Sequence, residues 1–255
     1  MEIKTLRKAL AVGVLAITSG YATQASAVPS FGFTEYGGFA VDVSVATYSD
    51  PLVGPASLIP AVTPLYETMS WVNTAFPQSS LNLSTVTGPA PLPFSTWTTI
   101  STLTHNNIVI PLATNWGPQD IWGRFKITDS DGAPTVRLDS DDAITISFVE
   151  TVNATPCPAP NPNGSTCDDS FTFTAVGLSD LPFTANDGSN WLAQFRLANL
   201  VGAIQIGSTI YTAEAQSSHL DVQVLVSQIP EPATLSLFGL GLLGLGLARR
   251  RQLKG

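Results

Sequence analysis

Short runs of β-forming residues, separated by turn residues, dominate the chain between residues 31 and 226. In the clearest run, Leu220, Val222, Val224 and Val226 alternate with polar residues, which places them on one face of a strand. No window of comparable length shows a helical period as clean. Around twelve such runs predict an all-β fold, namely an antiparallel β-sandwich or jelly-roll-like single domain. The expected strands are residues 39–48, 67–73, 80–86, 97–103, 107–112, 121–127, 134–138, 143–152, 170–176, 191–197, 203–211 and 219–226.

The first 27 residues have the three parts of a secretory signal peptide. A positive segment with Lys4, Arg7 and Lys8 precedes an apolar run of about nine residues, and Ala25-Ser26-Ala27 is a small-residue cleavage motif. The alternative is a transmembrane anchor, but the apolar run is about half the ~20 residues that a bilayer helix needs. We therefore predict a signal peptide at residues 1–27, with Ala25 and Ala27 at the cleavage site.

The segment between the two ends of the chain is strongly acidic. Residues 28–228 contain 17 carboxylates and only four cations, which gives a formal charge of −13. The four cations are Arg124, Lys126, Arg137 and Arg196. Such a surface repels phosphate backbones, so no nucleic-acid partner is expected. Residues 28–228 are expected to form the acidic extracellular β-sandwich domain.

The C-terminal segment, residues 229–255, consists of three blocks in a fixed order. The motif Pro230-Glu231-Pro232 comes first, an apolar run through residue 248 follows, and Arg249, Arg250 and Arg251 form a basic cluster. This arrangement resembles the PEP-CTERM sorting signal of bacterial envelope and exopolysaccharide-associated proteins. The resemblance implies that an exosortase-type membrane peptidase recognises the tail and cuts near Pro230-Glu231-Pro232.

The physical properties of the tail favour the same interpretation. Two prolines end the preceding strand and hold the motif extended for a protease. The apolar run, residues 233–248, would span about 24 Å as a helix, against a hydrocarbon core of ~30 Å. The arginines keep the C-terminus cytoplasmic. We expect transient membrane insertion through a short transmembrane helix; an ordinary C-terminal anchor is the alternative.

A second motif lies in the acidic segment, where Thr104, His105 and Asn107 form the tetrapeptide Thr-His-x-Asn. The chain resembles the THxN group of PEP-CTERM proteins, named for this motif. Other segments that fit the group are Ser70-Trp71, Phe148-Val149-Glu150-Thr151-Val152-Asn153 with Pro156-Cys157, and Cys167-Asp168-Asp169 with Phe171. The resemblance implies a compartment and a fold but no established enzymatic activity, so it assigns no catalytic residue.

Cys157 and Cys167 are the only cysteines in the chain. In an exported protein, this pair predicts one disulfide that closes a short loop. A metal site is a poor alternative, because the chain has neither CxxC spacing nor a histidine near these cysteines.

Acidic side chains offer candidate oxygen ligands for calcium, in one group at Asp129, Asp131, Asp139, Asp141 and Asp142, and elsewhere at Asp168 and Asp169. Asp129-Ser130-Asp131-Gly132 begins like a calcium loop but lacks the later carboxylates of an EF-hand. The alternative is a turn between strands with solvated aspartates. No cofactor is therefore expected, with calcium at Asp129 and Asp131 as a weak candidate.

Catalytic motifs are missing from the sequence. His105 and His219 are the only histidines, and no nucleophile elbow, HExxH motif, P-loop or dinucleotide fingerprint occurs. Glu150 would need a second carboxylate for glycoside hydrolysis. Five tryptophans could stack on sugars, but such residues are more often core. We therefore expect no enzyme and no catalytic residue.

These features together predict an exported protein of the cell envelope, outer surface or extracellular space. Its expected partners are signal peptidase, the general secretion machinery and an exosortase-type peptidase, and exopolysaccharide or biofilm is the expected associate. Two alternatives from other classes stay open: a secreted carbohydrate-active hydrolase and a calcium-dependent adhesin, each on a β-sandwich scaffold. His105 and Glu150 on opposite faces would disfavour the hydrolase.

Overall fold

The structure is a computed structural model, and it is almost entirely β. It describes residues 29–41, 46–51, 64–71, 78–85, 91–109, 115–129, 135–176, 178–230 and 239–242. The strands are β1 (Phe31–Ala40), β2 (Thr47–Pro51), β3 (Leu65–Trp71), β4 (Ser79–Thr85), β5 (Thr98–Asn106), β6 (Asn115–Asp129), β7 (Thr135–Val149), β8 (Asp169–Val176), β9 (Leu181–Thr184), β10 (Asn190–Val201), β11 (Ala203–Ile206), β12 (Thr209–Thr212) and β13 (Ser217–Gln228).

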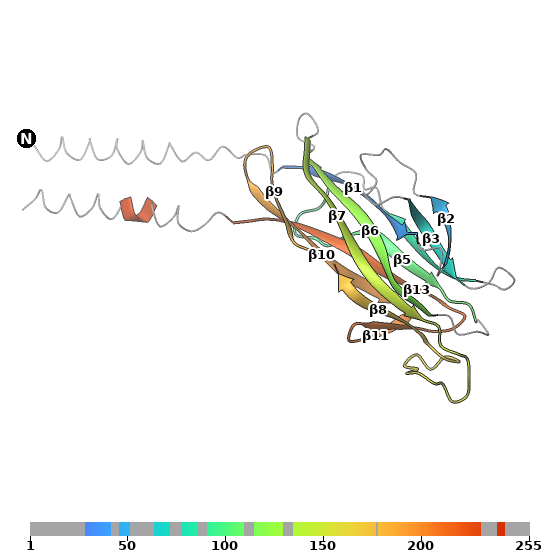
Figure 1. Cartoon of the computed structure of the whole chain (residues 1–255). Helices are drawn as coiled ribbons and strands as arrows, with labels where there is room; N and C mark the ends of the chain where they lie inside the picture. Colours follow the sequence, from blue (N-terminus) through green and yellow to red (C-terminus); the bar gives the residue numbers. More distant parts are fainter. Residues whose placement is uncertain are drawn as a thin grey trace, which may run out of the picture.

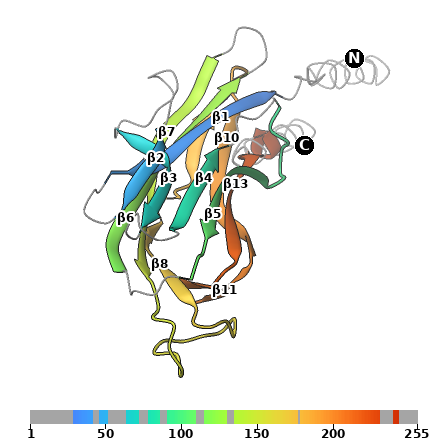
Figure 2. The same ribbon diagram turned by 90° about the vertical axis from the view of Figure 1, so that its right-hand side faces the viewer.

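All the paired strands belong to one 13-stranded sheet, and every strand pair is antiparallel. The strand order is β11-β12-β8-β7-β6-β1-β3-β4-β5-β13-β10-β9, with β2 paired to β3 beside this path. The sheet curls, so that β10 and β13 lie across from β6 and β7 (Figures 1 and 2). The predicted all-β antiparallel class is confirmed, in the form of one continuous sheet folded over its own core.

Two hydrophobic clusters fill the space inside the curled sheet. The first joins Phe31 and Phe33 of β1 to Trp191 of β10 and to Val224 and Val226 of β13. These residues come from both halves of the sheet, so their burial holds the two halves together. Each large apolar side chain buried in this way stabilises a fold by about 1.5–3 kcal/mol.

The second cluster lies closer to the other end of the strands. Met69 and Trp71 of β3 pack there with Leu81 of β4 and with Ile146 and Phe148 of β7. The alternating pattern of the sequence produces this core directly, because Leu81 and Leu83 are buried while Asn82 between them is half-buried.

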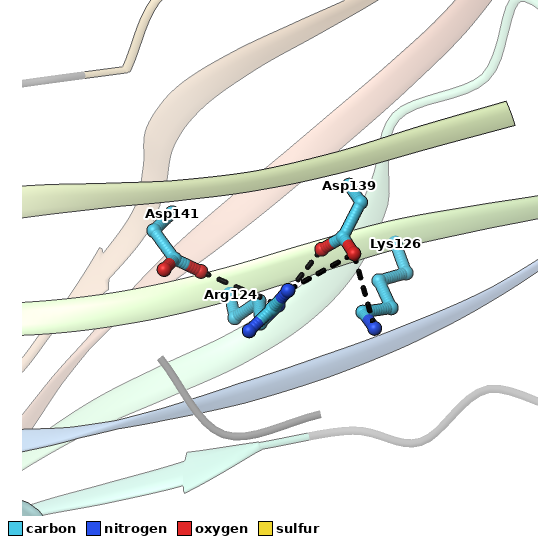
Figure 3. A network of polar contacts seen from close by, with 4 residues as sticks. All are labelled: Arg124, Lys126, Asp139 and Asp141. Atoms are coloured by element: carbon cyan, nitrogen blue, oxygen red, sulfur yellow. Dashed lines mark hydrogen bonds and ion pairs between the residues drawn. The ribbon is translucent and has the colours of Figure 1, made fainter. Parts of the chain in front are cut away.

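The longest strands, β6 and β7, pair along most of their length and carry opposite charges. Arg124 lies opposite Asp141 in the register, and Lys126 lies opposite Asp139. The Arg124 Nε donates to Asp139 Oδ1 over 2.8 Å, and Lys126 Nζ lies 3.1 Å from Asp139 Oδ2 (Figure 3). The Arg124 guanidinium holds the pKa of Asp139 below its usual value. These aspartates therefore pair across strands.

The start of β1 and the end of β13 lie at the same end of the molecule. The Phe31 ring is 5.1 Å from the Trp191 ring, and Trp191 is the register partner of Gln228. The segment between β7 and β8 extends beyond the opposite end of the sheet (Figure 1). The start of β1 and the end of β13 are therefore far from the segment between β7 and β8.

Candidate functional site

His105 of the Thr-His-x-Asn motif lies near the end of β5 and is buried. Its ring stacks on Trp71 at a centroid distance of 5.6 Å and meets the Phe171 ring edge-on at 4.7 Å. Burial lowers the pKa of His105 to about 3, so the ring is neutral at physiological pH. Among the described residues, neither ring nitrogen has a hydrogen-bond partner. His105 therefore acts here as an aromatic core residue.

Asn107, the last residue of the motif, connects the end of β5 to the segment before β13. Its backbone N–H donates to the Gln216 carbonyl over 3.0 Å, and its side-chain amide donates to the Ala213 carbonyl over 3.2 Å. The same side chain lies beside Asp169 and acts to lower the pKa of that carboxyl against the effect of burial. Asn107 is 3% exposed, so these contacts lie inside the fold.

Three buried carboxylates meet beside Asn107, and we call Glu150, Asp169 and Glu214 the acidic cluster. Glu150 directly follows β7, Asp169 begins β8, and Glu214 precedes β13. One oxygen atom from each lies within 4.8 Å of the other two. The exposed fractions are 1%, 0% and 5%. Side chains from three separate strand ends are thus brought to one buried point.

Each member of the acidic cluster accepts a hydrogen bond that fixes its position. Trp71 Nε1 donates to Glu150 Oε2 over 3.5 Å. The backbone N–H of Thr151 donates to Asp169 Oδ1 over 2.8 Å, and Asn153 Nδ2 donates to Glu214 Oε1 over 2.9 Å. The motif residue Asn107, the Glu150-Thr151-x-Asn153 segment and Asp169 therefore belong to one site.

Burial disfavours the charged form of these carboxylates. Burial raises the pKa of Glu150 to about 9, with further contributions from the Asp169 and Glu214 carboxylates. Burial also raises the pKa of Asp169 to about 7 and raises the pKa of Glu214. Three carboxylates in contact repel one another, so the cluster holds protons at neutral pH unless a cation compensates it.

A disulfide loop lies next to the acidic cluster and hydrogen-bonds the backbone of Glu214. Cys157 and Cys167 are joined as predicted, with a Cα–Cα distance of 5.6 Å. Within the loop, Ser165 Oγ donates to Asp168 Oδ1 over 2.6 Å and accepts from the backbone N–H of Glu214 over 3.4 Å. The backbone N–H of Asn163 donates to Asp168 Oδ2 over 2.7 Å. The disulfide thus holds the loop against the residues that position Asp169 and Glu214.

Replacing both Cys157 and Cys167 by serine is expected to lower the free energy of unfolding by about 2.5 to 3 kcal/mol, because the crosslink restricts the unfolded chain. Urea denaturation of the double variant measures this change. Wild type unfolded under reducing conditions is the control and should show the same loss. An unchanged unfolding midpoint in both samples would show that the bridge adds no stability.

Of the sequence's calcium candidates, Asp169 lies in the acidic cluster, whereas Asp129 of the calcium-loop motif lies at the end of β6. Asp129 is fully buried, accepts a hydrogen bond from the Asn186 backbone N–H over 2.9 Å and lies 3.7 Å from Arg137 Nε. Asp131 falls outside the described residues.

A cavity lined mainly by apolar side chains lies between the two halves of the sheet, and Glu35 of β1 contributes a carboxylate to it. Burial raises the pKa of Glu35 well above its ordinary value. The cavity wall includes Phe125 of β6 and Phe195 of β10, whose rings meet edge-on at 5.1 Å.

The predicted processing sites are mostly outside the described residues: the cleavage residues Ala25 and Ala27, the motif residues Glu231 and Pro232, and Arg249, Arg250 and Arg251. Pro230 is described; it follows β13 and is exposed. Residues 239–242 are helical. Within the described part of the chain, no helix has the length and apolar character needed to cross a membrane.

Two features bear on the alternative of a carbohydrate-active hydrolase: the placement of His105 and Glu150, and the burial of the tryptophans. His105 and Glu150 do not lie on opposite faces, because both contact Trp71. Trp71, Trp116 and Trp191 are buried core residues with at most 3% exposure, as tryptophans usually are.

The sequence did not point to Glu214, although the site depends on it. Glu214 stands in the segment Ala213-Glu214-Ala215-Gln216, which carries no motif. Only the return of the chain from β12 to β13 brings it to Glu150 and Asp169. A lone glutamate between two strands gives no signal of that kind.

The tail is identified by comparison with known proteins. Residues 228–252 match the family described as PEP-CTERM protein-sorting motif. This match confirms the predicted sorting signal and indicates an exosortase-targeted protein exported to the cell envelope. It covers the tail and not the β domain, so the THxN resemblance remains a prediction. No curated protein matches the sequence.

Proposed function

We propose that this chain is a non-enzymatic protein of the cell surface or extracellular matrix, released from a transient membrane-inserted state by an exosortase-type peptidase. The observation that carries the proposal is the sorting motif at residues 228–252. It begins at the last residue of β13 and continues into the exposed Pro230. A peptidase can therefore reach the junction without unfolding the sheet.

The arrangement of the two ends supports export through a membrane. The start of β1 and the end of β13 lie at the same end of the fold, so the signal peptide and the tail leave the domain together. Signal peptidase removes the first segment after Ala27, and Arg249 to Arg251 hold the tail's C-terminus on the cytoplasmic side. The folded domain then lies on the outer face.

The buried position of the acidic residues supports a non-enzymatic role. Glycoside hydrolysis needs two carboxylates that flank a bound sugar. Glu150, Asp169 and Glu214 are at most 5% exposed, and the disulfide loop packs against them. A polysaccharide chain does not reach carboxylates in this position. The THxN group, to which we assign the domain, likewise has no established activity.

We assign exopolysaccharide as the associate of the processed protein. The expected result is that the protein, purified from culture, sediments with polysaccharide extracted from the same cells and releases no reducing ends from it. Sedimentation and a reducing-sugar assay on one sample measure both properties. Failure to sediment would contradict the association, and release of reducing ends would favour the hydrolase.

A further inference from the structure

The acidic cluster gathers buried oxygen atoms that have no hydrogen-bond partner among the described residues. Each of its three carboxylates keeps one such oxygen: Glu150 Oε1, Asp169 Oδ2 and Glu214 Oε2. Two neutral side chains beside them also have a buried oxygen without a hydrogen-bond partner, namely Asn107 Oδ1 and Thr212 Oγ1. Asn107 is 3% exposed and its side chain lies beside Asp169, so its unpartnered oxygen lies in the same buried region. A buried oxygen without a hydrogen-bond partner lowers the stability of the fold, so most such atoms in native proteins bind a donor, a water or an ion.

Among the described residues, no cationic side chain pairs with the acidic cluster. The four cations of residues 28–228 are all engaged elsewhere. Arg124 and Lys126 pair with Asp139, Arg137 lies beside Asp129, and Arg196 stacks over Trp97 at 4.1 Å. Buried carboxylates that have no side-chain cation are normally neutralised by protons or by a metal ion.

The donor set fits a hard divalent cation. Calcium takes six to eight oxygen ligands at about 2.3–2.6 Å, so two of its ligands stand at most about 5 Å apart. The three carboxylate oxygens of the cluster lie within 4.8 Å of one another, as one coordination sphere requires. No histidine or cysteine joins the described group, which disfavours zinc.

We propose that the acidic cluster and Asn107 bind one calcium ion, which ties the ends of β5, β7 and β8 to the segment before β13. This site is separate from the Asp129 and Asp131 candidates, and it does not depend on the proposed surface function. It gives the Thr-His-x-Asn motif a role, since Asn107 contributes a neutral oxygen to a set of anionic ligands. Magnesium fits less well, because it keeps several waters and demands a small octahedral site.

The test uses the processed protein purified from culture, stripped of metal by chelation at pH 8. Calcium chloride is expected to bind once per chain by isothermal titration and to raise the unfolding temperature by about 5 °C or more. Magnesium chloride at the same ionic strength should raise it far less. No bound calcium with an unchanged unfolding temperature would overturn the site, and an equal response to magnesium would overturn its assignment to calcium.

A pair of variants locates the ion. Glu150→Gln keeps the size of the side chain and removes a buried negative charge, so this variant should fold without metal yet lose the calcium response. Asp139→Asn removes a carboxylate that pairs with Arg124 far from the cluster, and it should keep the full response. Retention of the response in Glu150→Gln, or its loss in Asp139→Asn, would contradict the assignment.

Discussion

A variant with alanine in place of Pro230, Glu231 and Pro232 is expected to accumulate in the membrane fraction as an unprocessed chain. In the wild type, the proline-bounded motif begins two residues after the end of β13, and the family match begins at residue 228. Without the motif, the exosortase-type peptidase has no recognition element, while the apolar run and the arginines still insert. Immunoblots of membrane and culture fractions, with one antibody to the domain and one to the last residues, measure this result.

The matched control for this experiment replaces Arg249, Arg250 and Arg251 by lysine. This change keeps three positive charges, so the orientation of the tail and its processing should be preserved. Processing of the alanine variant at the wild-type rate would contradict the role of the Pro-Glu-Pro motif. Loss of processing in the lysine variant would show that the cluster is recognised by more than its charge.

Trp71→Ala is expected to destabilise the domain by about 3–5 kcal/mol, the usual cost of removing a buried aromatic side chain. Trp71 is 1% exposed, and its ring contacts four other aromatic rings, those of His105, Trp116, Phe148 and Phe171. Its ring is 4.6 Å from Phe148 and 5.6 Å from His105, and its Nε1 donates to Glu150. The substitution would therefore open a cavity and remove a hydrogen bond to a buried carboxylate. Urea denaturation measures the change.

Trp97→Ala is the control, because Trp97 is half-buried and its ring lies under the Arg196 guanidinium. It should cost about 1 kcal/mol, the size of a partly exposed cation–π contact. If both variants lost the same free energy of unfolding, the aromatic rings around Trp71 would not make the large contribution to stability that we expect.

Local pattern was enough to predict the class of the fold and several of its details. The alternation at residues 219–226 became β13, whose burial pattern keeps Leu220, Val224 and Val226 inside. The pairing of Cys157 and Cys167 followed from composition and compartment. The alternation is a local pattern, and the cysteine pair is the only one in the chain, so both predictions could be made from a single sequence.

Strand boundaries were harder to predict, for identifiable physical reasons. Residues 134–138 and 143–152 were expected to be two strands, separated by a segment that contains Asp139, Asp141 and Asp142. In the structure β7 is continuous, because cations on β6 pair with two of those aspartates across the ladder. Conversely, the run 203–211 looked like one strand and is the hairpin of β11 and β12, with Gly207 at a φ of 62° in the turn.

Two further predictions of local structure were wrong. The run 107–112 looked like a strand, but residues 107–109 have no strand structure, since Asn107 turns inward to the Ala213 carbonyl and Asp169. The first strand begins at Phe31 and ends at Ala40, whereas residues 39–48 were expected. The small strand β9 was not predicted; it pairs with β10 over four residues.

The sequence offered Asp169 as a calcium ligand, but it could not predict the acidic cluster, because topology brings its members together. Consecutive members of the site are separated by 19 to 45 residues in the chain: Asn107, Glu150, Asp169 and Glu214. They meet only because the C-terminal ends of β5 and β7 lie beside the N-terminal ends of β8 and β13. The cluster lies at one end of β13 and the sorting tail leaves from the other. A strand of 12 residues separates them by about 40 Å. In a chain inserted through its tail, the cluster therefore lies at the end far from the membrane.

Intact-mass spectrometry of the native protein from the cell envelope and culture medium tests most directly whether the chain is exported and trimmed at both ends around an intact β domain. We expect a chain that begins at Val28, ends near Pro230-Glu231-Pro232, lacks Arg249 to Arg251 and carries the Cys157–Cys167 disulfide. A full-length chain in the cytosol, with residues 1–27 and Arg249 to Arg251 still attached, would contradict this expectation.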